Sequence, residues 1–190
     1  MGKERRYERI LIELVVAMAV AAIIAAVIIP TALRRMREGR VPAARRELRE
    51  LAAAVHRFQS DTGRWPNRTD PDGRNDVYVL YTGTMDEWPL DGTGGSWMEV
   101  ASFGRAGNVI GFLNGNLYGF PGWNGPYLAG EGISLDPWGR SYLIQVQEEG
   151  DESMAIFVIS AGPDGVLQTP RLQSPESFRV EGDDIAILIK

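Results

Sequence analysis

The longest apolar run in the chain extends from Ile10 to Ile29, ILIELVVAMAVAAIIAAVII, and contains one charged residue, Glu13. A helix of twenty residues is about 30 Å long, which is the thickness of the hydrocarbon core of a bilayer. Pro30 follows the run directly. The pattern therefore predicts a transmembrane helix. A carboxylate inside such a span indicates a functional residue, although Glu13 lies near the start of the run and could instead extend to the lipid headgroups.

A second helical pattern follows between Ala43 and Ser60. Its apolar residues recur at the spacing of one helix face, and they are Leu48, Leu51, Val55 and Phe58. Charged residues fill the other positions, which predicts an amphipathic helix with this stripe against a core. A kink or short break is expected at Gly39 and Pro42, and the helix should end at Gly63.

The rest of the chain predicts short strands separated by turns. The candidate strands are Val77–Tyr81, Met98–Phe103, Ser141–Gln147, Met154–Ser160 and Ile185–Ile189. A further apolar turn is expected at Val109–Leu113, and the sequence DPWG from Asp136 to Gly139 has the composition of a type I turn. The expected fold class is α+β, with one long N-terminal helix on a small antiparallel β-sheet.

Charge divides the chain into two parts. Residues 1–60 contain 12 Lys and Arg against 6 Asp and Glu, a net charge of +6, and residues 61–190 contain 8 against 19, a net charge of −11. Basic residues beside a membrane span are common, and here they alternate with acids along a helix without a stacking platform, so no nucleic-acid partner is expected. The chain has no cysteine and one histidine, His56, and carries no catalytic motif. We therefore expect no enzyme.

The block LIELVVAMAVAAIIAAVIIP, a lone Glu in an apolar helix that ends at a Pro, resembles the start of type IV pilin-like proteins. The segment PAARRELRELAAAVHRFQSDTGRWPN is similar to the amphipathic half of the same helix in that family. Further along, GPYL, DPWGRSY, SAGPDG and GDDI are similar to segments of the major pseudopilin of type II secretion systems. The resemblance covers residues 9–66 and 124–190 and leaves residues 67–123 unmatched.

This resemblance implies a pilin-like organisation of the chain. It places a basic leader at residues 1–8, a transmembrane helix at 9–30, the amphipathic continuation of that helix at 31–62 and a globular periplasmic β domain at 63–190. The implied function is that of a pseudopilin, a single-pass inner-membrane subunit that polymerises through its N-terminal helix into a periplasmic filament and so drives type II protein secretion. The implied partners are minor pseudopilins, the secretion platform and a prepilin peptidase.

Assembly and processing in the resembling family depend on the start of the helix. The resemblance assigns assembly to Glu13 and Pro30, with Glu13 neutralising the new N-terminal amine of a neighbouring subunit. Methylation is also implied by the resemblance. Prepilins normally carry Gly before the cleavage point and Phe after it. Here these two positions hold Glu8 and Arg9, so the processing site that the resemblance implies departs from the family pattern.

The resemblance also implies a calcium site near the C-terminus. The segments SAGPDG and GDDI place carboxylates beside strand ends, and Ca²⁺ prefers six to eight oxygen ligands in irregular loops. The major pseudopilin family binds Ca²⁺ at the matching loop. Its implied side-chain ligands here are Asp164 and Asp184, followed by Asp183 and Ser160. The alternative is a simple turn at Asp164 and a charged strand edge at Asp183 and Asp184.

Two other functions remain open on the sequence. One is a pilin-like subunit of a surface or DNA-uptake fibre. The other is a membrane-anchored monomeric binding module whose ligand site is an aromatic loop, formed by Tyr118, Phe120, Trp123 and Tyr127. These aromatic side chains could stack on sugar, but sealing of the loop against the amphipathic helix is the simpler interpretation.

Overall fold

The computed structural model describes residues 18, 39–69, 77–130, 133, 135–146 and 153–190. The expected transmembrane helix, apart from Met18, and the positions Glu8, Arg9, Glu13 and Pro30 lie outside these residues. Within the described ranges, no helix has the length and apolar character needed to cross a membrane. The chain divides into two compact units, Met1–Arg40 and Val41–Lys190, and the second unit contains nearly all of the described structure.

The N-terminal helix covers residues 39–62. Its predicted stripe is confirmed, because Leu48, Leu51, Val55 and Phe58 are all fully buried in the main core. Gly63, at φ 69°, ends the helix as expected. The break expected at Gly39 and Pro42 is wrong for the described part, since residues 39–62 are continuously helical. The ring of Pro42 fixes φ near the helical value, so this residue fits within a helix although it has no backbone N–H to donate.

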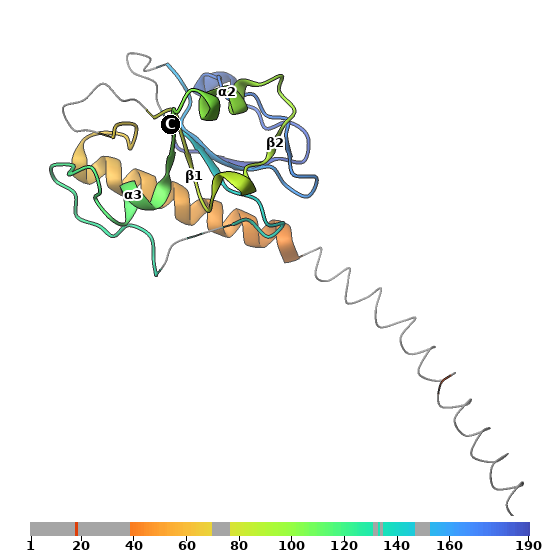
Figure 1. The fold of residues 1–190 in the computed structure, drawn as a ribbon, viewed down its shortest axis with the longest axis horizontal. Helices are drawn as coiled ribbons and strands as arrows, with labels where there is room; N and C mark the ends of the chain where they lie inside the picture. Colours follow the sequence, from red (N-terminus) through yellow and green to blue (C-terminus); the bar gives the residue numbers. More distant parts are fainter. Residues whose placement is uncertain (1–17, 19–38, 70–76, 131–132, 134, 147–152) are drawn as a thin grey trace, which may run out of the picture. The chain divides into compact units, whose positions relative to one another are not determined.

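Five strands form the main sheet of the described residues, in the order β3-β1-β4-β5-β7. Figure 1 labels β1 of this sheet, together with β2, α2 and α3. The strands are β1 (Val79–Tyr81), β3 (Ala106–Asn108), β4 (Leu143–Gln145), β5 (Phe157–Ser160) and β7 (Ile185–Leu188). The strands expected near residues 77–81, 141–147, 154–160 and 185–189 are therefore confirmed. Two further strands, β2 (Leu90–Asp91) and β6 (Val166–Leu167), pair with each other in parallel. The N-terminal helix packs on the main sheet, since Leu48 and Ile144 belong to one core.

The expectation of a purely antiparallel sheet is wrong. Strands β1, β4, β5 and β7 are antiparallel neighbours, but β3 runs parallel to β1. The helix α2 (Ser96–Ser102) lies between β1 and β3 in the sequence. Parallel neighbours need a long crossover, which usually contains a helix. The sheet is therefore mixed, and residues 63–190 form a domain that contains helices as well as strands.

The strand expected at Met98–Phe103 is also wrong, because this segment belongs to α2. Trp97 and Val100 are the buried residues of α2 and lie three positions apart, on one helix face. The carboxylate of Asp91 accepts hydrogen bonds from the backbone nitrogens of Trp97 and Met98, at 2.8 and 2.9 Å. It therefore satisfies N–H groups at the helix start that have no partner within the helix.

The apolar turn expected at Val109–Leu113 is a short helix, α3 (Val109–Leu113). Its N-cap is Asn108, whose side chain accepts a hydrogen bond from the backbone nitrogen of Ile110 at 2.9 Å. The two remaining short helices of the described residues are η1 (Met85–Glu87) and η2 (Pro175–Ser177), both 3₁₀ helices. The expected turn after Asp136 is confirmed, because the backbone nitrogen of Gly139 donates to the carbonyl of Asp136 at 2.9 Å.

Candidate functional site

The acidic residues expected to bind calcium lie in two loops at one end of the sheet. Asp164 belongs to the turn between β5 and β6, and Asp183 and Asp184 directly precede β7. Strands β5 and β7 pair with Ser160 opposite Ile185, which brings the two loops together. The structure thus places residues that are about twenty positions apart in the sequence beside one another.

Asp164 and Asp183 interact directly. The backbone nitrogen of Asp164 donates to Oδ2 of Asp183 at 3.3 Å. Partial burial and the neighbouring carboxylate of Asp164 raise the pKa of Asp183 above its ordinary value. Burial would also raise the pKa of Asp164, but hydrogen bonds from Val166 and Gln168 outweigh this effect and lower it. Two adjacent carboxylates repel each other when both are ionised, and a cation between them would relieve that repulsion.

Asp184 holds the start of the segment that follows β6. Its Oδ2 accepts hydrogen bonds from the backbone nitrogens of Gln168 and Thr169, at 2.9 and 2.7 Å. Its other oxygen, Oδ1, is buried and has no hydrogen-bond partner among the described residues. Burial raises the pKa of Asp184 above its ordinary value, although the two hydrogen bonds oppose the change.

Gln168 is a site residue that the sequence did not reveal. Its Nε2 donates to Oδ2 of Asp164 at 2.6 Å, while its Oε1 is buried without a partner in the described structure. A Cβ added at Gly182 would lie 2.5 Å from this Oε1. A single Gln after a strand has no distinctive sequence signal, and only the fold brings it between Asp164 and the loop before β7.

Ser160 faces a different partner. Its hydroxyl donates to Oδ2 of Asp136 at 2.6 Å and accepts a hydrogen bond from the backbone nitrogen of Gly162 at 3.1 Å. Oδ1 of Asp136 in turn accepts from the backbone nitrogens of Trp138 and Arg140, both at 2.9 Å. The Ser160 side chain thus joins the end of β5 to the DPWG turn.

Gly162 allows the two acidic loops to approach each other. It has φ 66°, and a Cβ at this position would lie 2.2 Å from the carbonyl oxygen of Asp183. Any other residue would therefore be strained and would also displace the loop before β7. The backbone contact with Asp183 therefore explains why the SAGPDG segment has glycine at position 162.

The chemistry of these loops suits a hard cation that binds oxygen. Within the described residues, no group of three or more His, Cys, Asp or Glu side chains converges to hold a metal ion. However, Oδ1 of Asp184 and Oε1 of Gln168 are buried oxygens without partners, and the carboxylates of Asp164 and Asp183 are adjacent. A buried oxygen without a hydrogen bond is costly unless another group satisfies it. Backbone carbonyls and water would complete an oxygen shell for Ca²⁺.

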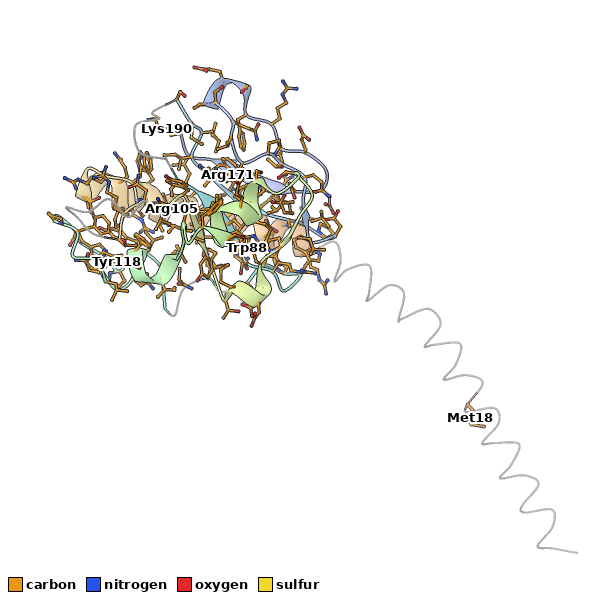
Figure 2. The ribbon with its side chains drawn as sticks, turned by 45° about the horizontal axis from the view of Figure 1, so that its top comes forward. Met18, Trp88, Arg105, Tyr118, Arg171 and Lys190 are labelled. Atoms are coloured by element: carbon orange, nitrogen blue, oxygen red, sulfur yellow. The ribbon has the colours of Figure 1, made fainter. Side chains whose placement is uncertain are left out.

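The aromatic loop seals the domain against the N-terminal helix, as the simpler interpretation predicted. Phe120 and Tyr127 are buried, with ring centroids 5.0 and 5.8 Å from that of Phe58. The Tyr127 hydroxyl donates to Oδ2 of Asp61 on the helix at 2.9 Å. The ring of Tyr118, which is labelled in Figure 2, packs on the ring of Phe112 in α3, and the two ring centroids are 4.6 Å apart. These rings are engaged in the core, which leaves little aromatic surface for a sugar.

The fold is thus an α+β domain in which a helix covers a mixed sheet and two acidic loops meet at one sheet end. Residues 113–173 match the family model of type II secretion system (T2SS) protein G, the major pseudopilin. This match supports a pseudopilin-like protein, and the family is one of structural pseudopilins, not of enzymes. The matched segment includes Ser160 and Asp164 and ends before Asp183. No curated protein and no solved structure matches the chain.

Proposed function

We propose that the chain is a pseudopilin that polymerises through its N-terminal helix into a periplasmic filament for type II protein secretion. The observation that carries the proposal is the family match over residues 113–173. The apolar run Ile10–Ile29 with Glu13 and Pro30 supports it from the other end of the chain. The N-terminal helix would be transmembrane in its first half and would continue into the described helix at residues 39–62.

In this proposal, Glu13 binds the N-terminal amine of a neighbouring subunit. That amine would belong to Arg9 if a prepilin peptidase cleaves after Glu8. Minor pseudopilins and the secretion platform would be the other partners, in and beside the bacterial inner membrane. The packing of the aromatic loop counts against a monomeric module that binds sugar through the same loop.

The test is to co-express the full-length chain with its prepilin peptidase and the secretion platform. The N-terminal mass should correspond to cleavage after Glu8, and electron microscopy of sheared membranes should show filaments that contain the chain. A second sample without the peptidase should keep the leader and form no filaments. An uncleaved chain that stays monomeric in the complete system would contradict the proposal.

We also propose that the loops around Asp164 and Asp184 hold Ca²⁺, with Asp183 as a further ligand and Ser160 at the edge of the site. What supports this is the set of buried oxygens without partners, Oδ1 of Asp184 and Oε1 of Gln168. The bound ion would tie the turn after β5 to the start of β7. With no cysteine in the chain, no disulfide can serve this purpose.

A further inference from the structure

Gln168 has a buried side-chain oxygen that no group in the described structure satisfies. The residue follows β6 directly, and its Oε1 has no hydrogen-bond partner among the described residues. The other end of the amide is engaged, because Nε2 donates to Oδ2 of Asp164 at 2.6 Å. An ionised carboxylate accepts hydrogen bonds but donates none, so Asp164 fixes which end of the amide is nitrogen. The remaining end is therefore an acceptor.

This oxygen lies against the loop that precedes β7. A Cβ added at Gly182 would lie 2.5 Å from Oε1 of Gln168 and 2.6 Å from Cδ of the same amide. The side chain of Gln168 therefore packs directly on the backbone of Gly182, where only a residue without a side chain leaves room for it. Asp183 and Asp184 follow Gly182 in the sequence. Oε1 thus lies beside the segment that carries both carboxylates.

The main chain of Gln168 is bound to the same segment. Its backbone nitrogen donates to Oδ2 of Asp184 at 2.9 Å. Asp184 has 8% of its surface exposed, and its Oδ1 is the other buried oxygen of these loops without a partner in the described structure. The two orphaned oxygens therefore belong to two residues that a hydrogen bond joins. Two acceptors cannot satisfy each other, and each costs free energy unless a donor or a cation supplies the missing partner.

The charge of the loops favours a neutral oxygen at this position. The carboxylates of Asp164, Asp183 and Asp184 meet at one end of the sheet, and their combined charge exceeds that of a divalent cation. Ca²⁺ takes about six to eight oxygens, and side-chain amide carbonyls are among its usual ligands. An amide oxygen therefore adds a ligand without adding repulsion between carboxylates.

We propose that Gln168 is a ligand of the calcium ion through Oε1, and that Asp164 positions this oxygen by accepting the hydrogen bond from Nε2. The proposal rests on the calcium site proposed above. It adds to that site a ligand from outside the SAGPDG and GDDI segments. Loss of this oxygen alone should weaken calcium binding even though every carboxylate is kept.

The test is calorimetric titration of the metal-stripped full-length chain with Ca²⁺ in detergent. Gln168→Met keeps the shape of the side chain but removes its polar atoms, and it should raise the dissociation constant for Ca²⁺ by about tenfold or more. Gln168→Glu keeps an oxygen and removes the donor, so it should retain calcium binding. Gln59→Met, the same substitution on the N-terminal helix, is the matched control and should bind Ca²⁺ as the wild type does.

A second measurement uses the wild-type chain, so it does not depend on whether a variant folds. The chain has five Gln residues, and ¹³C labelling of Gln gives a simple NMR spectrum of their side-chain carbonyl carbons. Addition of Ca²⁺ should shift the signal of Gln168, because a bound ion polarises the carbonyl that it contacts. The signal of Gln59 should stay where it is.

The outcomes separate the role of Gln168 from the calcium site itself. If the wild type binds Ca²⁺ but Gln168→Met has an unchanged dissociation constant, or the Gln168 carbonyl signal does not move, the ligand role is overturned and the site stands. An equal loss of affinity in Gln168→Met and Gln168→Glu would also overturn that role, because it would show that only the donor to Asp164 matters. A wild-type chain that binds no Ca²⁺ would overturn the site and the ligand role together. None of these results depends on filament formation.

Discussion

At the scale of single residues, the most telling group is the Asp184 carboxylate. One of its oxygens accepts two backbone hydrogen bonds, and the other is buried without a described partner. Burial raises the pKa of this group, so its ionised form is disfavoured unless a positive charge is added. A bound cation would supply that charge and would satisfy the orphaned oxygen.

The first prediction follows from this carboxylate. Millimolar Ca²⁺ should raise the melting temperature of the metal-stripped chain in detergent, and at 100 times its dissociation constant it would add about 2.7 kcal/mol. Asp184→Asn should abolish the increase, because it keeps the acceptor for Gln168 and Thr169 but removes the charge. Asp164→Ala should do the same. Calorimetry with Ca²⁺ or a chelator measures the effect.

The control for this prediction is Asp86→Ala, because Asp86 is exposed on η1 and should leave the calcium response unchanged. The response should also depend on pH. The pKa values of Asp183 and Asp184 are raised above 3.8, so without calcium these two groups favour the folded state at low pH and lose that contribution as the pH rises through their folded values. Calcium binds the ionised forms, so its stabilisation should shrink as the pH falls toward 3.8. Melting curves that are identical with and without Ca²⁺ at neutral pH would refute the site.

At the scale of elements, the helix and the sheet are joined by a buried tyrosine. The hydroxyl of Tyr142, which directly precedes β4, donates to Oε2 of Glu47 on the N-terminal helix at 2.6 Å. Burial, reinforced by the hydrogen bond and the negative charge of Glu47, raises the pKa of Tyr142. The hydroxyl is therefore protonated at neutral pH and donates its proton to the hydrogen bond with Glu47.

The second prediction concerns this bond. Tyr142→Phe should lower the free energy of unfolding by about 2 kcal/mol, since it removes a buried hydrogen bond to a carboxylate. Glu47→Gln keeps an acceptor and should cost less. Denaturant unfolding of both variants and of the double variant gives the coupling between the two side chains. Additive effects of the two substitutions would show that the bond contributes no stability.

The elements divide clearly into those that the sequence predicts and those that it does not. The stripe of Leu48 to Phe58 and the buried strands β4 and β5 have patterns that reflect burial directly, so they were predictable. The segment Met98–Phe103 was misread because its helix depends on Asp91, a cap that lies outside the segment. The parallel pairing of β3 with β1 needs the long crossover that contains α2. It could not be predicted while the α2 segment was taken for a strand. Gln168 joins the acidic loops only through the fold, which no local pattern encodes.

The third prediction tests the N-terminal helix as a part of the core. A fragment that begins at Pro42 should fold alone, because it keeps the four fully buried side chains of the helix stripe. A fragment that begins at Gly63 should aggregate or stay unfolded, since the sheet would lose its cover, including the ring contacts of Phe58. Amide NMR spectra distinguish the two outcomes. A well-dispersed spectrum from the shorter fragment would contradict this role of the helix.

At the scale of the whole molecule, the proposed function gives two parts of the chain separate roles. The described domain from Val41 onward has its own core and the acidic loops. The apolar run Ile10–Ile29 has one charged residue, Glu13, and all of it except Met18 lies outside the described residues. A membrane anchor that also polymerises needs an interaction that is absent in the monomer. In the proposed filament, Glu13 provides it by binding the N-terminal amine of a neighbour.

The last prediction is that Glu13→Ala separates membrane insertion from assembly. Removal of a carboxylate from an apolar run lowers the cost of burial, so insertion should be at least as efficient as in the wild type. Filament yield should fall to background, because the neighbour's amine loses its counter-charge. Glu13→Gln should fail in the same way if charge is what matters, while Glu4→Ala, outside the run, should leave assembly intact. Membrane fractionation measures insertion, and electron microscopy of sheared filaments measures assembly. Normal filament yield from Glu13→Ala, with insertion intact, would remove Glu13 from the assembly mechanism.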